Sequence, residues 1–246
     1  MRRFFYHPGD EAAGCVAISD AEAHHIRTVL RMRPGDTAEL LDGAGGALTG
    51  EIERISADSV SFRILSRRTE PESGSPLTLV MALLKGKKMD KVVQKAAELG
   101  VSRFVPVITR YCEPQGRDSQ LFDRWQRIML EACKQCGRLR LMEISPPQPL
   151  HGLHFPAESQ KIMPWENETA SSFAAAGVQP GQPLILLIGP EGGFHPAEVE
   201  QAKHWGFRTV SLGPRVLRAE TAAVAAAALA QHLLGNLEPP EHPIFY

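Results

Sequence analysis

The sequence predicts an α/β protein with a mostly parallel sheet, preceded by a smaller domain built of strands. From Leu77 onward, apolar runs alternate with amphipathic helical segments, which is typical of a parallel sheet covered by helices. The first 70 residues instead alternate short apolar and polar stretches between tight turns. A chain of 246 residues is long enough for two domains. We therefore expect domains over residues 1–72 and 73–246.

Turn-forming residues divide the first domain. Arg33–Asp36 and Asp42–Gly46 are rich in Gly, Pro and Asp, and residues of this kind interrupt strands. The polar stretch Arg67–Pro76 has no apolar periodicity and predicts the domain boundary. Between these signals the sequence predicts three strands, over Ala38–Leu41, Ala47–Ile55 and Ser59–Leu65.

Helical spacing of apolar residues marks the second domain. Lys87–Leu99 and Ser119–Cys136 each carry an apolar stripe, and each precedes a glycine where a helix would end. Further helices are predicted over Ala197–Trp205 and Thr221–Leu234. The strands predicted here are Leu77–Leu84, Arg103–Thr109, Lys161–Met163, Leu184–Ile188 and Thr209–Leu212.

The net charge of −1 conceals a basic segment. Residues 85–140 carry 13 Lys and Arg against 6 Asp and Glu, whereas both flanking regions are net acidic. Such a block is either an evenly solvated surface or a phosphate-binding face, and charge alone does not decide between them.

Composition excludes several classes of protein. No apolar run approaches the roughly 20 residues that a membrane span needs. Four cysteines are too few for a disulfide scaffold, and Cys133 and Cys136 have no second ligand pair at zinc spacing. Asp10 and Glu11 follow the N-terminal Met1–Tyr6 before any signal-peptide-length apolar stretch forms. We expect a mature, cytoplasmic protein without a metal site.

Two glycine-bearing loops follow predicted strands. Leu184–Ile188 leads into Gly189–Phe194, and Thr209–Leu212 leads into Gly213–Thr221. Ligands of open α/β sheets bind at the carboxyl ends of strands, and glycine lets the backbone approach them. A tight strand-to-helix turn would also explain such a loop. Neither loop has the dinucleotide-binding or P-loop spacing.

The two loops together carry a specific resemblance. G-P-E-G-G-F at 189–194 and L-G-P-R-V-L-R-A-E-T-A-A at 212–223 resemble the signature of the ribosomal RNA small subunit methyltransferase E family, the 16S rRNA uracil-N3 methyltransferases of the SPOUT superfamily. The resemblance extends over nearly the whole chain, including K-G-K-K-M-D-K at 85–91 and E-A-C-K-Q-C-G-R at 131–138. Val216 and Ala219 replace the more usual Ile and Thr.

The resemblance implies a fold and a cofactor. Residues 1–72 should form a PUA-like β-barrel, an RNA-binding domain, and residues 73–246 a SPOUT-type parallel sheet with a C-terminal trefoil knot. The cofactor would be S-adenosylmethionine, the protein a homodimer, and the partner small-subunit rRNA, free or within the assembled subunit. The cofactor-binding residues that it implies are Gly189, Glu191, Gly192, Gly193, Leu212, Gly213, Leu217, Thr221 and Ala222.

The reaction suggests roles for two side chains. Methyl transfer is an in-line displacement, so the protein mainly aligns the reactants and stabilises charge. We hypothesise that Arg218 stabilises the uracil anion and that Glu220 orients the base or accepts its N3 proton. Alternatively, the two side chains pair with each other or cap the helix. The RNA-binding candidates are Arg2, Arg3, Arg27, Arg31, Lys85, Lys87, Lys88, Lys134 and Arg138.

Two other functions stay open at this point. One is a SPOUT ribose 2′-O-methyltransferase acting on tRNA or rRNA, whose last motif would carry an S-L-N type sequence that this chain lacks. The other is a non-catalytic RNA-binding protein of ribosome assembly. Affinity for S-adenosylmethionine separates the second from an enzyme.

Overall fold

The computed structural model describes residues 1–70, 74–112 and 118–239. Contacts divide the chain into two compact units. Unit 1 contains the N-terminal residues together with Cys133–Leu141, and unit 2 contains Gly74–Ala132 and the chain from Met142. The sequence prediction had assigned Cys133–Leu141 to the second domain. Its boundary at 72/73 lies outside the described residues.

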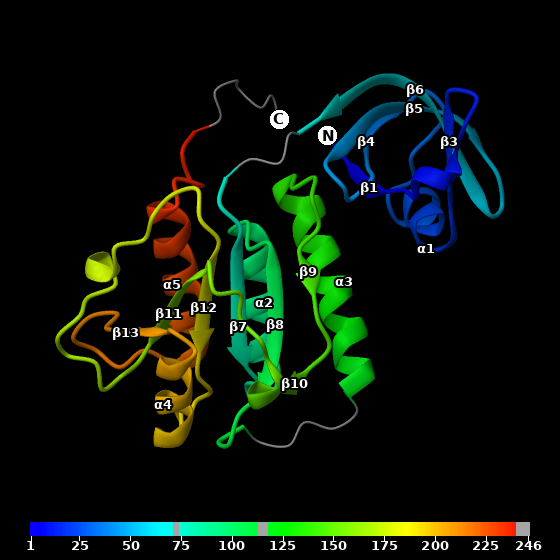
Figure 1. The fold of residues 1–246 in the computed structure, drawn as a ribbon. Helices are drawn as coiled ribbons and strands as arrows, with labels where there is room; N and C mark the ends of the chain where they lie inside the picture. The colour runs from blue at the N-terminus through cyan, green and yellow to red at the C-terminus, as the bar shows by residue number, and fades with distance from the viewer. Residues whose placement is uncertain (71–73, 113–117, 240–246) are drawn as a thin grey trace. The chain divides into compact units, whose positions relative to one another are not determined.

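Unit 1 is a curled six-stranded sheet (Figure 1). Its spatial order is β1-β4-β5-β6-β3-β2; β1 pairs parallel with β4, and every other pair is antiparallel. The short helix α1 (Asp20–His24) and a π-helical turn (His25–Val29) join β3 to β4. The strands are β1 (Arg3–Phe5), β2 (Glu11–Ala12), β3 (Cys15–Ser19), β4 (Thr37–Leu41), β5 (Gly46–Ile55) and β6 (Ser59–Thr69).

A buried carboxylate joins three strands of unit 1. Glu39 on β4 is only 5% exposed. Its Oε2 accepts a hydrogen bond from Arg3 Nε at 2.7 Å, and its Oε1 accepts from Arg68 Nη2 at 2.7 Å. Arg3 also donates to the carbonyl of Lys134. Two arginines therefore satisfy a charge that would otherwise be costly to bury.

Unit 2 is built on a parallel sheet in the order β10-β8-β7-β12-β11-β13, with β9 paired to β8. All its strand pairs are parallel. Five strands agree with the prediction to within two residues, and β12 matches it at both ends. The strands are β7 (Leu77–Ala82), β8 (Arg103–Ile108), β9 (Glu143–Ile144), β10 (Gln148–Pro149), β11 (Gln160–Pro164), β12 (Leu184–Ile188) and β13 (Arg208–Val210).

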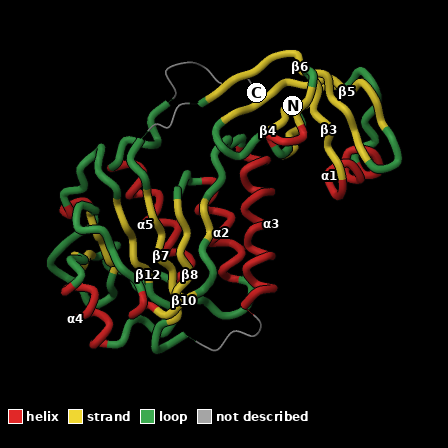
Figure 2. Tube along the Cα trace, turned by 45° about the vertical axis from the view of Figure 1, so that its right-hand side comes forward, coloured by secondary structure: helices red, strands yellow, loops and turns green. Residues whose placement is uncertain are grey.

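Four helices longer than α1 follow strands of this sheet in the chain (Figures 1 and 2). Helix α5 packs against β7, β12 and α2. The predicted apolar stripe of α2 is buried, and Gly100 after it has φ +77°, as a helix-ending glycine requires. The helices are α2 (Lys88–Glu98), α3 (Asp118–Cys136), α4 (Pro196–His204) and α5 (Ala219–Leu233).

Alternate residues of the central strands form one of the cores of unit 2. Val80 and Ala82 on β7, with Ile185 and Leu187 on β12, pack with Val199 of α4. This spacing of two is that of residues on one face of a sheet. Among the described residues, no helix is long and apolar enough to cross a membrane.

We expect replacement of Glu39 by Gln to lower the free energy of unfolding of unit 1 by about 3 kcal/mol, because Arg3 would lose its charged partner in a poorly exposed position. Hydrogen exchange of the β4 and β5 amides measures this change. The matched control is Glu51→Gln, which removes the exposed Glu51–Arg63 pair of the same sheet. It should cost less than about 1 kcal/mol. Equal costs would contradict a structural role for Glu39.

Glu39 also sets an acid limit on stability. Burial alone would raise the pKa of Glu39, but the hydrogen bonds from Arg3 and Arg68 outweigh it and lower the pKa. The stabilisation is therefore present above the unfolded-state pKa of about 4.3 and is lost as the pH falls through the lower, folded-state pKa. In urea denaturation, the difference in the free energy of unfolding between wild type and Glu39→Gln should be constant from about pH 7 to 5 and should shrink below about pH 4. A difference that persists undiminished through acid would refute this linkage.

Candidate active site

A cavity of about 600 Å³ lies where three parallel strands of unit 2 end. The segments that follow β11, β12 and β13 line it, and so does the first turn of α5. This volume suits a small-molecule ligand of nucleoside size, and the carboxyl edge of a parallel sheet is where such ligands bind. The lining comprises Lys88, residues 164–166, 188–194 and 211–219, and Ala222.

The loop after β12 brings bare backbone to the cavity. Gly193 has φ +71°, and a Cβ added there would collide with the carboxylate of Glu166. A Cβ at Gly189 would lie 3.0 Å from the ring of Phe194. The left-handed backbone of Gly193 therefore favours glycine, whereas a larger residue at 189 would require the Phe194 ring to shift.

The loop after β13 is held by the segment after β11. The amide of Trp165 donates to the Val210 carbonyl at 3.0 Å, and the Ser211 amide donates to the Ser171 carbonyl at 2.7 Å. Thr209 Oγ1 donates to Glu168 at 2.6 Å. Beyond these bonds Gly213 has φ +112°, which turns the chain toward α5. One wall of the cavity is thus fixed by backbone hydrogen bonds between distant segments.

An ion pair forms another part of the lining. Lys88 Nζ lies 2.8 Å from Glu191 Oε1, which also accepts the amide of Lys85 at 3.1 Å. Burial would raise the pKa of Glu191, but the hydrogen bond from Lys88 and those from backbone amides lower it. The hydrogen bond to Glu191 raises the pKa of Lys88, and the charge of Glu220 adds to this effect. The start of α2 is thereby joined to the loop after β12.

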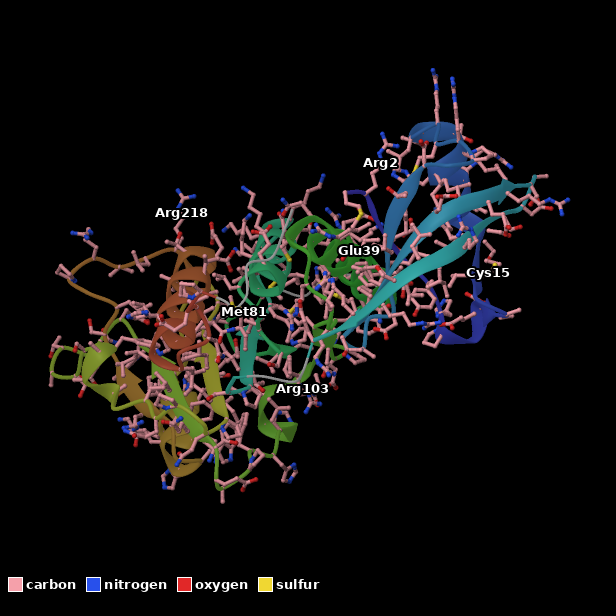
Figure 3. All side chains as sticks on the ribbon, turned by 90° about the horizontal axis from the view of Figure 1, so that it is seen from above. Arg2, Cys15, Glu39, Met81, Arg103 and Arg218 are labelled. Carbon is pink, nitrogen blue, oxygen red and sulfur yellow. The ribbon has the colours of Figure 1, made fainter. Side chains whose placement is uncertain are left out.

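Arg218 and Glu220 flank the start of α5 without pairing. Arg218 is exposed and projects away from the ribbon (Figure 3). In the part of the chain that the structure describes, neither a hydrogen bond nor an ion pair engages its guanidinium group. Glu220 Oε2 is buried and has no hydrogen-bond partner there. Glu220 is not a lining residue, although Ala219 and Ala222 beside it in α5 are. The alternative in which these two side chains pair with each other therefore lacks support in the structure.

Eight of the nine predicted cofactor residues line this cavity. The other one, Thr221, is exposed and not part of the lining. Sequence reasoning missed Pro164, Trp165 and Glu166, although the predicted strand Lys161–Met163 ends at the same sheet edge and could have indicated them. It also assigned Lys88 to RNA alone, whereas Lys88 contacts Glu191 in the lining.

The nine RNA-binding candidates differ in how their side chains are engaged. Arg31, Lys85 and Lys87 are exposed, as is Arg2, which donates to the Leu30 carbonyl. The others contact protein groups in their own unit: Arg3 with Glu39, Arg27 with the Ser56 and Ala57 carbonyls, Lys88 with Glu191, Lys134 with Glu22, and Arg138 with the Arg140 carbonyl.

The cavity fits S-adenosylmethionine by the chemistry of its lining. Backbone amides and carbonyls of two glycine-bearing loops line it and can meet an adenine edge and a ribose. Among the described residues, no group of His, Cys, Asp or Glu could hold a metal ion.

Family models match both parts of the chain. Residues 71–231 match an RNA methyltransferase domain, and residues 18–65 match an RNA methyltransferase PUA domain. A ribosomal RNA small subunit methyltransferase E from Buchnera aphidicola subsp. Schizaphis graminum is 31% identical over 238 residues, which cover 90% of this chain and 92% of the relative.

Solved structures show the same likeness. A ribosomal RNA small subunit methyltransferase E from Neisseria gonorrhoeae, bound to S-adenosylmethionine, has TM-score 0.84 and 32% identity over 95% of this chain and 98% of its own. A putative methyltransferase from Legionella pneumophila, with the same cofactor bound, has TM-score 0.84 and 32% identity over 94% and 96%. The predicted SPOUT-type parallel sheet and PUA-like domain are confirmed. The chain belongs to the ribosomal RNA small subunit methyltransferase E family of RNA methyltransferases.

Proposed function

We propose that this protein transfers a methyl group from S-adenosylmethionine to N3 of a uridine in small-subunit rRNA. The observation that carries the proposal is that two groups at the start of α5 are unengaged: the exposed guanidinium of Arg218, which lines the cavity, and the buried, unpartnered oxygen of Glu220. A buried carboxylate oxygen without a donor costs stability, so its retention calls for a role with a ligand. The substrate class rests on the family.

The two side chains suit the change in charge during the reaction. Bound S-adenosylmethionine supplies an electrophilic methyl group on a sulfonium. We assign Glu220 Oε2 to accept the proton of N3–H, so that N3 can form its new bond to carbon as the S–CH₃ bond breaks. Arg218 then stabilises the negative charge that spreads over the two uracil carbonyl oxygens. The start of α5, with its positive helix dipole, favours the same charge.

The remaining parts of the proposal concern oligomeric state, location in the cell and RNA binding. We propose a homodimer that works in the cytoplasm on free or assembled small-subunit rRNA, and an RNA-binding role for the PUA-like unit. Exposed Arg2, Arg31, Lys85 and Lys87 are the candidates for phosphate contacts. The geometry gives Arg3 and Lys134 a structural role in unit 1, since carboxylates and carbonyls already engage them.

Two alternatives make different predictions. A ribose 2′-O-methyltransferase would place methyl groups on sugars, and Glu220 would have no uracil proton to accept. A non-catalytic RNA-binding protein has no need of a selective cofactor site, so its dissociation constant for S-adenosylmethionine should be no lower than for other adenine nucleosides. Isothermal titration calorimetry with S-adenosylmethionine and with another adenine nucleoside distinguishes the non-catalytic alternative from the proposal.

Arg218→Ala should lower kcat at least about 100-fold, because charge stabilisation in the transition state is lost. It should leave the dissociation constant of S-adenosylmethionine within about twofold. Arg218→Lys keeps the positive charge but not the planar guanidinium group, so its kcat should lie between those of the wild type and Arg218→Ala. Methyl incorporation into unmodified small subunits measures kcat. The control is Arg208→Ala, an exposed arginine outside the cavity lining. Unchanged turnover in Arg218→Ala would remove this residue from the mechanism.

Glu220→Gln should separate catalysis from stability. The amide cannot take the N3 proton, so kcat should fall by about 100-fold or more. Because Glu220 Oε2 is buried without a partner, loss of its charge should leave Tm unchanged or raise it. Thermal denaturation and single-turnover methylation give the two quantities. A lowered Tm with normal turnover would instead support a purely structural role at the helix start.

A further inference from the structure

The side chains of Arg110 and His195 meet beside the cofactor loop. Arg110 follows β8 and is exposed, and its Nη1 lies 3.0 Å from Nε2 of His195, which precedes α4. Neither residue lines the cavity described above. Tyr111 connects the two places, because a Cβ added at Gly192 of the cofactor loop would lie 3.1 Å from Tyr111 Cβ.

The other ring nitrogen decides what His195 Nε2 can do. Nδ1 accepts the backbone amide of Ala197 at 3.1 Å, as the cap of α4. An amide only donates, so in the tautomer that keeps this cap Nδ1 is the acceptor and Nε2 carries the ring proton. Arg110 also only donates. In that tautomer the Arg110 guanidinium and His195 Nε2–H are two donors 3.0 Å apart with no acceptor between them.

The nearby carboxylate does not resolve this conflict. Glu198 uses Oε1 to accept the amide of Arg110 at 2.8 Å and Oε2 to accept the amide of His195 at 2.9 Å. Among the described residues, no carboxylate forms an ion pair with the Arg110 guanidinium. Glu198 thus holds the two backbone segments together and leaves both side-chain donors to a ligand.

We propose that Arg110 and His195 Nε2–H bind one phosphodiester group of the substrate RNA, beside the nucleotide that enters the active site. One anionic oxygen can accept from both donors and so removes the donor–donor contact, and arginine is well suited to phosphate. Tyr111 is 47% exposed, and its ring meets that of His195 edge-on at 5.9 Å, so its free face can stack on a flanking base. This proposal rests on the proposed function and adds a substrate subsite to it.

The test measures binding of the full-length protein, saturated with S-adenosylmethionine, to unmodified small-subunit rRNA over a range of salt concentrations. Arg110→Ala should weaken binding by about 3- to 10-fold and lower the slope of log Kd against log salt by about 0.7, the value for one phosphate contact on single-stranded RNA. His195→Asn keeps an acceptor for the α4 cap, but its shorter side chain does not place a donor at the position of Nε2, so it should weaken binding too. The double variant should be weakened less than the product of the two effects, since both residues hold one group.

Arg103→Ala is the matched control. Arg103 begins β8, whereas Arg110 follows its other end, so the same charge is removed at the opposite end of the strand. An Arg110→Ala variant with the affinity and salt slope of Arg103→Ala would overturn the subsite while wild-type methylation stands. Weaker S-adenosylmethionine binding in Arg110→Ala, with unchanged RNA binding, would assign the donors to the cofactor carboxylate and also overturn it. A wild type that binds the cofactor but methylates no rRNA would remove the basis of both proposals.

Discussion

The backbone hydrogen bonds that fasten the segment after β11 to the end of β13 are the constraint on which the active site depends. Trp165 and Ser171 bond to Val210 and Ser211. They fix where the chain leaves β13 and therefore where Arg218 and α5 begin. Because β11, β12 and β13 are parallel, all three segments meet at one edge. A cofactor cavity follows from this topology, with glycines where the backbone must come close.

Two carboxylates of the same region differ in how they are satisfied. Glu191 is held by Lys88 and a backbone amide, so its charge is compensated. Glu220 has a buried oxygen with no such compensation among the described residues. Glu39, by contrast, is buried and satisfied by two arginines. This contrast between Glu39 and Glu220 supports the role with a ligand that we propose for Glu220.

Sequence reasoning succeeded where side-chain patterns determine structure. The apolar run Leu184–Ile188 correctly predicted the first and last residues of β12. The apolar stripe from Met89 to Ala97 correctly predicted the buried face of α2. Sequence reasoning did not predict β1, β2, β3, β9 and β10. Four of these have only two or three residues, too few to show a period, and depend on distant partners. The hydrogen bond from the Ser211 amide to the Ser171 carbonyl could not be predicted, since bonds between backbone groups do not depend on the identity of the side chains. The ion pairs of Arg3 with Glu39 and of Lys134 with Glu22 could not be predicted either, because the two partners of each pair lie far apart in the sequence.

The central claim is tested most directly by the identity of the methylated nucleoside. Purified protein would be incubated with labelled S-adenosylmethionine and small ribosomal subunits that lack native base methylations, and the digested RNA would be analysed by mass spectrometry. The account predicts label in 3-methyluridine. Label in a 2′-O-methylated nucleoside, or no incorporation despite measured binding of the cofactor and of the subunit, would contradict it.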